Sequence, residues 1–249
     1  MITFLRHCIC YGVCFLWTAL CSIAAVVCSA VCSVLFGWVD DKKQQHFLFG
    51  LGRVWAQGML TAVHHLLGID YRVTGLENMP ENTPFVVACK HQSTWETIAL
   101  LTMVRNPVFV LKHSLMAIPF FGRALKKAGM IPVVRGRPNK HFIEKAHHAI
   151  QSNNTIIIFP EGRRTPPGEK TRYFKGIFYI YHHCSIPVIP VALNSGVFWP
   201  RRTFFKRKGT ITVSFLKAID VGLPETEFMQ SLTQSIESCS AHLAHPFLP

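Results

Sequence analysis

The chain has 249 residues, enough for one sizeable globular domain with an accessory segment. Its 26 Lys and Arg against 13 Asp and Glu give a formal charge of +13, which favours an anionic partner: nucleic acid, an acidic lipid surface or a phosphorylated substrate. The hydrophobic content of 49% is high for a soluble nucleic-acid binder, and the excess is concentrated at the N-terminal end, which indicates a membrane.

The N-terminal region is predicted to contain membrane-associated helices. Residues 7–39 include no Asp, Glu, Lys or Arg, and about 20 apolar residues are enough to cross a bilayer as a helix. A cleaved signal peptide is the alternative, but its apolar region runs only about 7–15 residues. By the positive-inside rule, we expect Lys42, Lys43 and the basic remainder of the chain to lie on the cytoplasmic side of the membrane. Residues 47–69 are predicted to form an amphipathic helix or a lipid-facing hairpin partner.

From residue 71 onward, short β-rich runs alternate with stretches whose apolar residues have helical spacing. The predicted strands are residues 71–75, 85–89, 107–111, 131–134, 155–159, 186–193 and 210–215. The predicted helices are residues 96–104, 121–129, 141–151, 174–183 and, on the surface and without obvious chemistry, 225–244. We therefore expect an α/β domain in residues 71–249, with a mostly buried sheet flanked by helices, after membrane-anchoring helices in residues 1–70.

The segment KHQSTWET, residues 90–97, holds a candidate catalytic pair. It follows a predicted strand directly, so His91 lies at a strand's carboxyl end, where open α/β sheets bind their ligands. Glu96 falls in the first turn of the next helix and can orient the imidazole for proton transfer. For an isolated pair, a capping-box carboxylate beside a solvent-facing histidine would be the better interpretation.

The segment FPEGRRT, residues 159–165, also follows an apolar strand. Gly162 permits a tight turn, and Glu161 and Gly162 are interpreted as shaping the loop that presents Arg163 and Arg164. Guanidinium groups suit a phosphate or carboxylate, although a solvated basic loop is the alternative. Two further candidate phosphate ligands stand at or near the ends of other strands: Lys112 and Arg135.

Four blocks together carry a family resemblance: KHQSTWE, FFGRALKKAGMIPVVRG, FPEGRRT and IPVIPVAL. In this order and spacing they resemble the glycerolipid acyltransferase family, and most of all the bacterial 1-acylglycerol-3-phosphate (lysophosphatidic acid) acyltransferases. The resemblance implies an α/β domain docked on a membrane, a His-x4-Asp catalytic pair and an arginine that binds the acceptor's phosphate. These roles fall on His91, Glu96 and Arg164. Two features depart from the pattern: Glu96 replaces Asp, and EGRR replaces EGTR, which adds Arg163.

The implied reaction moves a fatty acyl group from acyl-CoA or acyl carrier protein to the free hydroxyl of 1-acylglycerol-3-phosphate, giving phosphatidic acid in phospholipid biosynthesis. His91 would act as general base without an acyl-enzyme, and neither a cofactor nor a metal is expected. The expected partners are the lysophospholipid, the acyl thioester, the membrane and, as one possible donor, acyl carrier protein, but not nucleic acid. Another lysophospholipid or a lyso-aminolipid is the alternative acceptor.

Other classes of protein explain less of the sequence. A hydrolase with Ser93 as nucleophile would be expected to carry G-x-S-x-G, which does not occur. A metal enzyme is suggested by three HH pairs, but adjacent histidines on a helix point in different directions and HExxH is absent. A non-catalytic basic membrane-binding protein explains the charge and hydrophobicity, but not the four ordered blocks.

Overall fold

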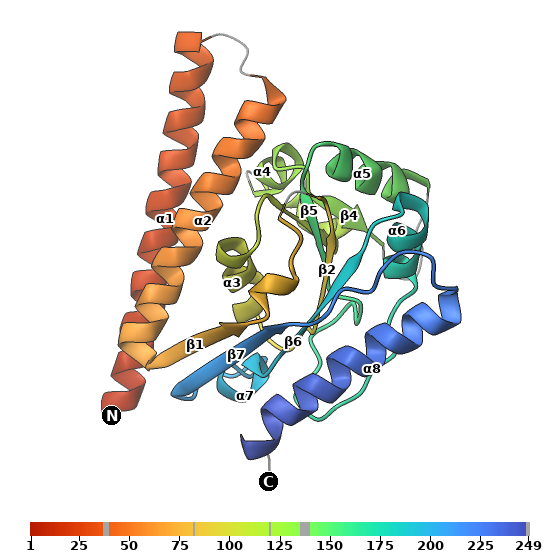
Figure 1. Ribbon diagram of the computed structural model, residues 1–249. Helices are drawn as coiled ribbons and strands as arrows, with labels where there is room; N and C mark the ends of the chain where they lie inside the picture. Colours follow the sequence, from red (N-terminus) through yellow and green to blue (C-terminus); the bar gives the residue numbers. More distant parts are fainter. Residues whose placement is uncertain (37–39, 82, 120, 135–139, 248–249) are drawn as a thin grey trace.

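The computed structural model describes residues 1–36, 40–81, 83–119, 121–134 and 140–247. A seven-stranded sheet has helices on both faces, and two long helices lie along one side of it (Figure 1). The predicted α/β fold with a buried sheet is therefore confirmed.

The two long helices are α1 (Ile2–Phe36) and α2 (Asp41–Leu67), which pack side by side as a hairpin. The indole N–H of Trp17 donates to the carbonyl of Trp55 at 2.9 Å, and the indole N–H of Trp55 donates to the Thr18 hydroxyl at 3.0 Å. Gly58 is required at this seam, because a Cβ there would lie 2.2 Å from Nε1 of Trp17. The second apolar stretch therefore lies in a helix that forms a hairpin with α1.

The outer helix of this hairpin carries the most apolar surface. In the described part of the chain, one helical stretch, Ile2–Cys28, is long and apolar enough to cross a membrane. Most of its large apolar side chains are exposed, whereas α2 packs inward against α3 (Trp95–Met103) and α4 (Phe121–Lys127). The α/β domain thus covers the inner side of the hairpin and leaves the outer side of α1 open.

The sheet has the order β1-β7-β6-β2-β5-β3-β4. Its strands are β1 (Ile69–Thr74), β2 (Val86–Cys89), β3 (Pro107–Lys112), β4 (Ile131–Val133), β5 (Thr155–Ile158), β6 (Val188–Leu193) and β7 (Gly209–Phe215). Each predicted strand is present. All neighbours are parallel except β6 and β7, which are antiparallel. The carboxyl ends of β6, β2, β5, β3 and β4 therefore meet at one edge.

Both faces of the sheet are buried because alternate side chains of a strand enter opposite cores. In β2, Val87 and Cys89 pack in the core that includes residues of α2 and α3. Val86 and Ala88 pack in the core on the other face. The helices on that face are α5 (Lys140–Gln151), α6 (Gly176–Cys184) and α8 (Glu225–Ala244). The sequence does not predict the short helix α7 (Ser195–Phe198) or the 3-10 turns Leu76–Asn78, His113–Ala117 and His245–Phe247. Segments of three to five residues are too short to display the helical period of apolar residues.

Candidate active site

The site is built where two parallel neighbours, β2 and β5, end at the same edge of the sheet. The loop after β2 carries His91, and the loop after β5 carries residues 159–165. The N–H of His91 donates to Oε2 of Glu161 at 2.7 Å, and the N–H of Thr165 donates to the carbonyl of His91 at 2.8 Å. The backbone of His91 is thus held by the second loop on both its donor and its acceptor side.

The imidazole of His91 is held by a carboxylate at its edge and an aromatic ring on its face. Nδ1 lies 2.9 Å from Oε1 of Glu96, and the ring stacks on Phe159 with centroids 4.2 Å apart. The His91 side chain remains 17% exposed, whereas that of Glu96 is 1% exposed. When Nδ1–H donates to the carboxylate, Nε2 carries the lone pair and is the nitrogen that can accept a proton.

The Glu96 carboxylate is fixed by five hydrogen bonds. Oε1 accepts from His91 and from the backbone N–H groups of Gln92 and Ser93, both at 2.7 Å. Oε2 accepts from the hydroxyls of Ser93 and Ser195, both at 2.7 Å. Glu96 therefore caps the first turn of α3 and orients His91 at the same time, so the two interpretations of this residue are not exclusive.

These contacts hold Glu96 in its ionised form. Burial by itself raises the pKa of the Glu96 carboxyl. The hydrogen bond and the charge interaction with His91 lower this pKa, and so do the hydrogen bonds from Ser93 and Ser195. Because these interactions outweigh burial, the pKa of Glu96 lies below its usual value. An ionised carboxylate beside Nδ1 stabilises the imidazolium that forms when Nε2 takes up a proton. The extra methylene of Glu relative to Asp is accommodated without loss of the 2.9 Å contact.

A buried ion network lies behind the His91 loop. Lys90, which is 2% exposed, has Nζ at 2.7 Å from Oε1 of both Glu161 and Glu237. The Tyr173 hydroxyl donates to the same Glu237 oxygen at 2.8 Å. Burial raises the pKa of the Glu161 carboxyl, and it outweighs the lowering by Lys90 and by the N–H of His91. The network joins β2, the loop after β5 and α8.

Three of these residues were missed by the sequence analysis: Lys90, Ser195 and Glu237. The sequence offered a signal for Lys90, because it stands between an apolar strand and the candidate base. A lysine that is buried at such a position needs a carboxylate partner. Ser195 and Glu237 stand in segments with no motif. Residues 225–244, predicted as a surface helix without obvious chemistry, contribute Glu237 of α8, which contacts the lysine next to His91.

The predicted phosphate ligands are only partly brought together. The guanidinium of Arg164 donates to the Thr94 hydroxyl at 2.7 Å, which places it over the His91 loop. Gly162 has φ +62° in the turn that presents it, and Arg163 is exposed. Lys112 is exposed at the end of β3. In the sheet β3 is separated from β2 by β5, so the two strands lie about 10 Å apart. Arg135 lies outside the described residues.

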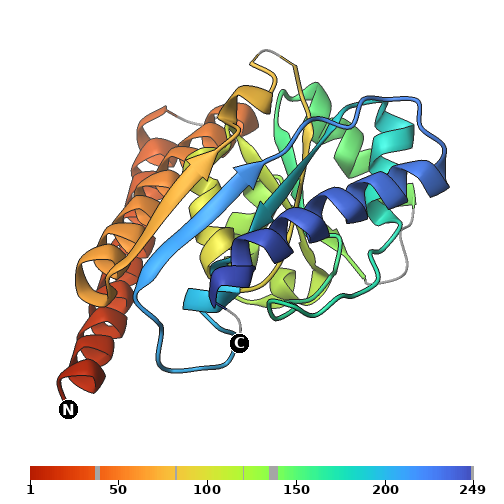
Figure 2. The same cartoon turned by 60° about the horizontal axis from the view of Figure 1, so that its bottom comes forward.

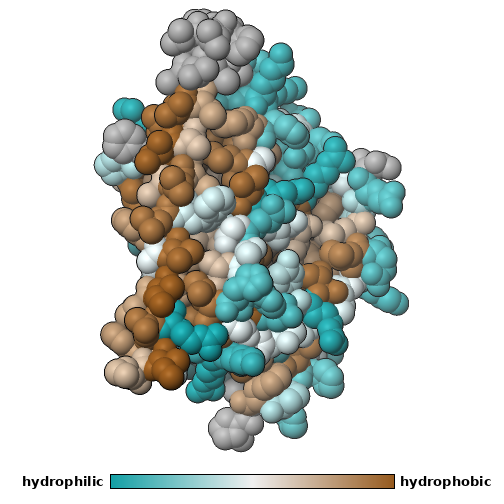
Figure 3. All heavy atoms as spheres, turned by 90° about the vertical axis from the view of Figure 1, so that its left-hand side faces the viewer, coloured by the Kyte–Doolittle hydropathy of each residue, from teal (hydrophilic) through white to brown (hydrophobic). Residues whose placement is uncertain are grey.

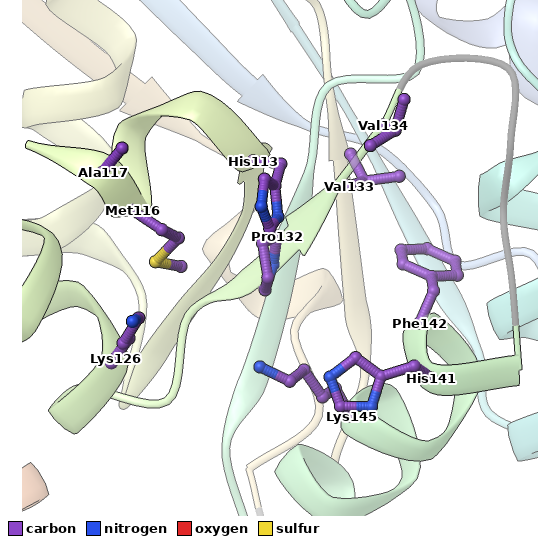
Figure 4. A pocket seen from close by; sticks show the side chains of 10 residues that line it. All are labelled: His113, Met116, Ala117, Lys126, Pro132, Val133, Val134, His141, Phe142 and Lys145. Carbon is purple, nitrogen blue, oxygen red and sulfur yellow. The ribbon is translucent and has the colours of Figure 1, made fainter.

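A separate pocket of about 540 Å³ lies beside the edge strand β4. Figure 4 shows its lining side chains, which come from the turn after β3, from α4, from β4 and from α5. It contains no residue of the two loops around His91. No group of three or more His, Cys, Asp or Glu suitable for a metal ion occurs among the described residues.

Comparisons with known proteins identify similar chains. A family model described as "Acyltransferase" matches residues 70–194. A 1-acyl-sn-glycerol-3-phosphate acyltransferase of Pseudomonas aeruginosa is 36% identical over 162 residues, covering 64% of this chain and 63% of that protein. Human 1-acyl-sn-glycerol-3-phosphate acyltransferase beta is 25% identical over 209 residues, covering 82% of this chain and 72% of that protein.

The match to some relatives is shorter than their full length. The chain spans 63% of the Pseudomonas protein and 52% of the chloroplastic Brassica napus protein, which is 26% identical. Among solved structures, the crystal structure of the 1-acyl-sn-glycerophosphate (LPA) acyltransferase PlsC from Thermotoga maritima has a TM-score of 0.76 and covers 98% of this chain and 99% of its own. At 20% identity this likeness shows a shared fold.

Proposed function

Because the chain belongs to the acyltransferase family, we propose that it transfers a fatty acyl group from an acyl thioester to the free hydroxyl of 1-acyl-sn-glycerol-3-phosphate, giving phosphatidic acid for phospholipid biosynthesis. The names of its relatives, which are 1-acyl-sn-glycerol-3-phosphate acyltransferases, support this acceptor. The observation that carries the proposal is the contact of His91 Nδ1 with buried Glu96 at 2.9 Å, which leaves Nε2 as a base beside a cationic loop.

In this mechanism the nucleophile is supplied by the substrate. The acceptor hydroxyl attacks the thioester carbonyl carbon while Nε2 of His91 takes the hydroxyl proton. The tetrahedral adduct then collapses: the C–S bond breaks, an ester forms, and the imidazolium returns the proton to the departing thiolate. Glu96 stabilises the transient imidazolium, as the acid of a serine triad does, and no acyl-enzyme is needed.

Arg164 is the proposed ligand for the acceptor's phosphate. Its guanidinium sits 2.7 Å from the hydroxyl of Thr94, three residues after the base, so a phosphate bound there keeps the glycerol hydroxyl near His91. Three further cations are proposed as weaker contributors around the same anion: Arg135, Lys112 and Arg163. Glu161 and Gly162 shape the loop, since Glu161 accepts the N–H of His91 and Gly162 makes the turn.

We propose that the enzyme works without a cofactor, with acyl-CoA or acyl carrier protein as the thioester. The apolar helix Ile2–Cys28 is able to anchor the protein to a membrane, and we place the α/β domain on the cytoplasmic face of the inner membrane. The acyl chains of both substrate and product are apolar, which is the physical reason for carrying the site on a membrane-associated hairpin.

The test is transfer of labelled acyl groups to lysophosphatidate by the detergent-purified protein, with acyl-CoA and acyl carrier protein as alternative donors. We compare wild type with His91→Ala, Arg164→Ala and, as a matched control, Arg163→Ala. We expect wild type to form phosphatidate, His91→Ala to lower kcat by about 10²–10⁴-fold, and Arg164→Ala chiefly to raise the KM for the acceptor.

Two results contradict the proposal. Undiminished activity in His91→Ala would remove His91 as the base. Acylation of another lysolipid by wild type, with no phosphatidate from either donor, would keep the base but exclude this acceptor.

A further inference from the structure

The loop between α7 and β7, residues 199–208, concentrates positive charge and aromatic rings on the surface. It contains five cations: Arg201, Arg202, Lys206, Arg207 and Lys208. No Asp or Glu occurs in residues 170–219. Phe204 and Phe205 are 42% and 51% exposed at its tip. We call residues 199–208 the basic–aromatic loop.

The aromatic tip lies against the first turns of the apolar helix α1. The ring of Phe204 is 5.6 Å from that of Phe4 and 5.2 Å from that of Tyr11, and Phe205 is 5.3 Å from His7. Phe4 is itself 56% exposed. The three phenylalanine rings contact one another and remain exposed, so they form a surface feature that is continuous with the exposed side of α1.

Hydrogen bonds hold the basic–aromatic loop in this position. The Tyr11 hydroxyl donates to the carbonyl of Phe204 at 2.6 Å, and the N–H of Lys206 donates to Nε2 of His7 at 2.9 Å. At the other side of the loop, the N–H of Arg207 donates to the carbonyl of Phe198 at 2.8 Å. Figure 2 shows the loop beside the N-terminal end of α1. The aromatic tip is therefore placed relative to α1 in the free protein.

We propose that the basic–aromatic loop is a second membrane contact, which docks on the headgroup region of an anionic bilayer leaflet beside α1. Aromatic rings favour the membrane–water interface, and each cation near an anionic surface contributes about 1 kcal/mol. Figure 3 shows the apolar stripe along this side of the molecule with hydrophilic residues next to it. Apolar helix, aromatic tip and flanking cations thus form one surface with the chemistry of the bilayer interface.

The loop also connects the membrane contact to the candidate site. The guanidinium of Arg201 lies 3.4 Å from the carbonyl oxygen of Arg164. Burial, with the nearby charge of Arg164, lowers the pKa of Lys206, in agreement with cations gathered at this point. Docking would therefore hold Arg164 at the level of phospholipid headgroups. This consequence for acyl transfer rests on the proposed function, whereas the docking itself does not.

The test is flotation of the full-length protein with phosphatidylcholine vesicles and with vesicles containing phosphatidylglycerol. Arg202→Gln/Arg207→Gln removes two exposed charges from the loop, and Phe204→Ser/Phe205→Ser removes the aromatic tip. Lys140→Gln/Lys145→Gln removes two charges from α5, on the side of the molecule away from α1 (Figure 1). Circular dichroism and thermal unfolding establish that each variant is folded.

We expect the arginine pair to weaken binding to anionic vesicles about 30-fold, from about 1 kcal/mol per cation, and to leave binding to neutral vesicles unchanged. The phenylalanine pair should weaken binding to both kinds of vesicle about tenfold. The control should bind as wild type does. Wild-type affinity of the arginine pair for anionic vesicles, or an equal loss in the control, would overturn the proposal.

A second readout separates this inference from the proposed function. With acceptor embedded in anionic vesicles, the arginine pair should raise the acceptor KM about tenfold, and with a short-chain soluble lysophosphatidate it should match wild type. If wild type acylates no lysolipid at all, the proposed function fails while the vesicle-binding result still decides the docking. An equal KM increase for the soluble acceptor would show that the arginines act in the site and not on the membrane.

Discussion

Around His91, most polar groups are buried and hydrogen-bonded, whereas in the basic–aromatic loop most of the cations are exposed. Glu96 accepts five hydrogen bonds, and Lys90 contacts two carboxylates at 2.7 Å. Arg202 and Arg207, by contrast, are exposed. The buried region therefore acts through geometry, and one substitution there has a large effect. The exposed region acts through summed charge, and single substitutions there have small effects.

The largest expected effect comes from Glu96→Gln. The substitution keeps the side-chain shape but removes the negative charge that stabilises the imidazolium of His91, so kcat should fall by about 10²–10⁴-fold. The measurement is kcat at saturating lysophosphatidate and acyl donor. The control is the exposed substitution Arg202→Gln, which should leave kcat unchanged. A kcat for Glu96→Gln within threefold of wild type would contradict the role assigned to this carboxylate.

The next effect concerns stability. Lys90→Met leaves Glu161 and Glu237 facing each other without their shared cation, and breaking a buried ion pair costs about 3–5 kcal/mol. Urea unfolding of this variant should show that loss. The matched exposed substitution Lys208→Met should change the free energy of unfolding by no more than about 0.5 kcal/mol. Equal stability of the two variants would mean that the buried network contributes no more than surface charge does.

Within the buried region, Glu96 and Glu161 should respond oppositely to acid. The lowered pKa of Glu96 means that it contributes stability above its unfolded pKa, and that this is lost as the pH falls through the folded pKa. The raised pKa of Glu161 means that its ionisation costs stability, which is recovered as the pH falls through its folded pKa.

The measurement is the free energy of unfolding from about pH 7 to about pH 3. Compared with wild type, Glu96→Gln should lose less stability on acidification and Glu161→Gln should lose more. The reverse order would show that the signs of the two pKa shifts are wrong. Comparing pH slopes instead of absolute values removes the pH-independent part of each substitution.

The smallest effect is expected at Arg163. It is exposed beside Arg164, so Arg163→Ala should change the acceptor KM by less than about threefold and stability by no more than about 0.5 kcal/mol. Steady-state kinetics over a range of lysophosphatidate concentrations checks this. A loss as large as that of Arg164→Ala would place Arg163 on the bound phosphate as well.

Much of the fold followed from local pattern. Residues 85–89 were predicted as a strand from continuous apolar character, and β2 is Val86–Cys89. The pairing of His91 with Glu96 was predicted from their position after that strand together with the four ordered blocks, and Nδ1 of His91 lies 2.9 Å from Oε1 of Glu96. The short helix α7 could not be predicted, because four residues carry no helical period.

The sequence by itself determined the strands, the longer helices, the apolar N-terminal segment and the proximity of His91 to Glu96, since each depends on residues close together in the chain. Only the tertiary structure decided that Ser195 binds Glu96, 99 residues away, and that Glu237 binds Lys90, 147 residues away. It also decided that residues 199–208 lie against α1. The physical reason is that these contacts depend on the order of β6, β2 and β5 in the sheet and on which face each helix covers, and no local pattern of apolar or charged residues carries that information.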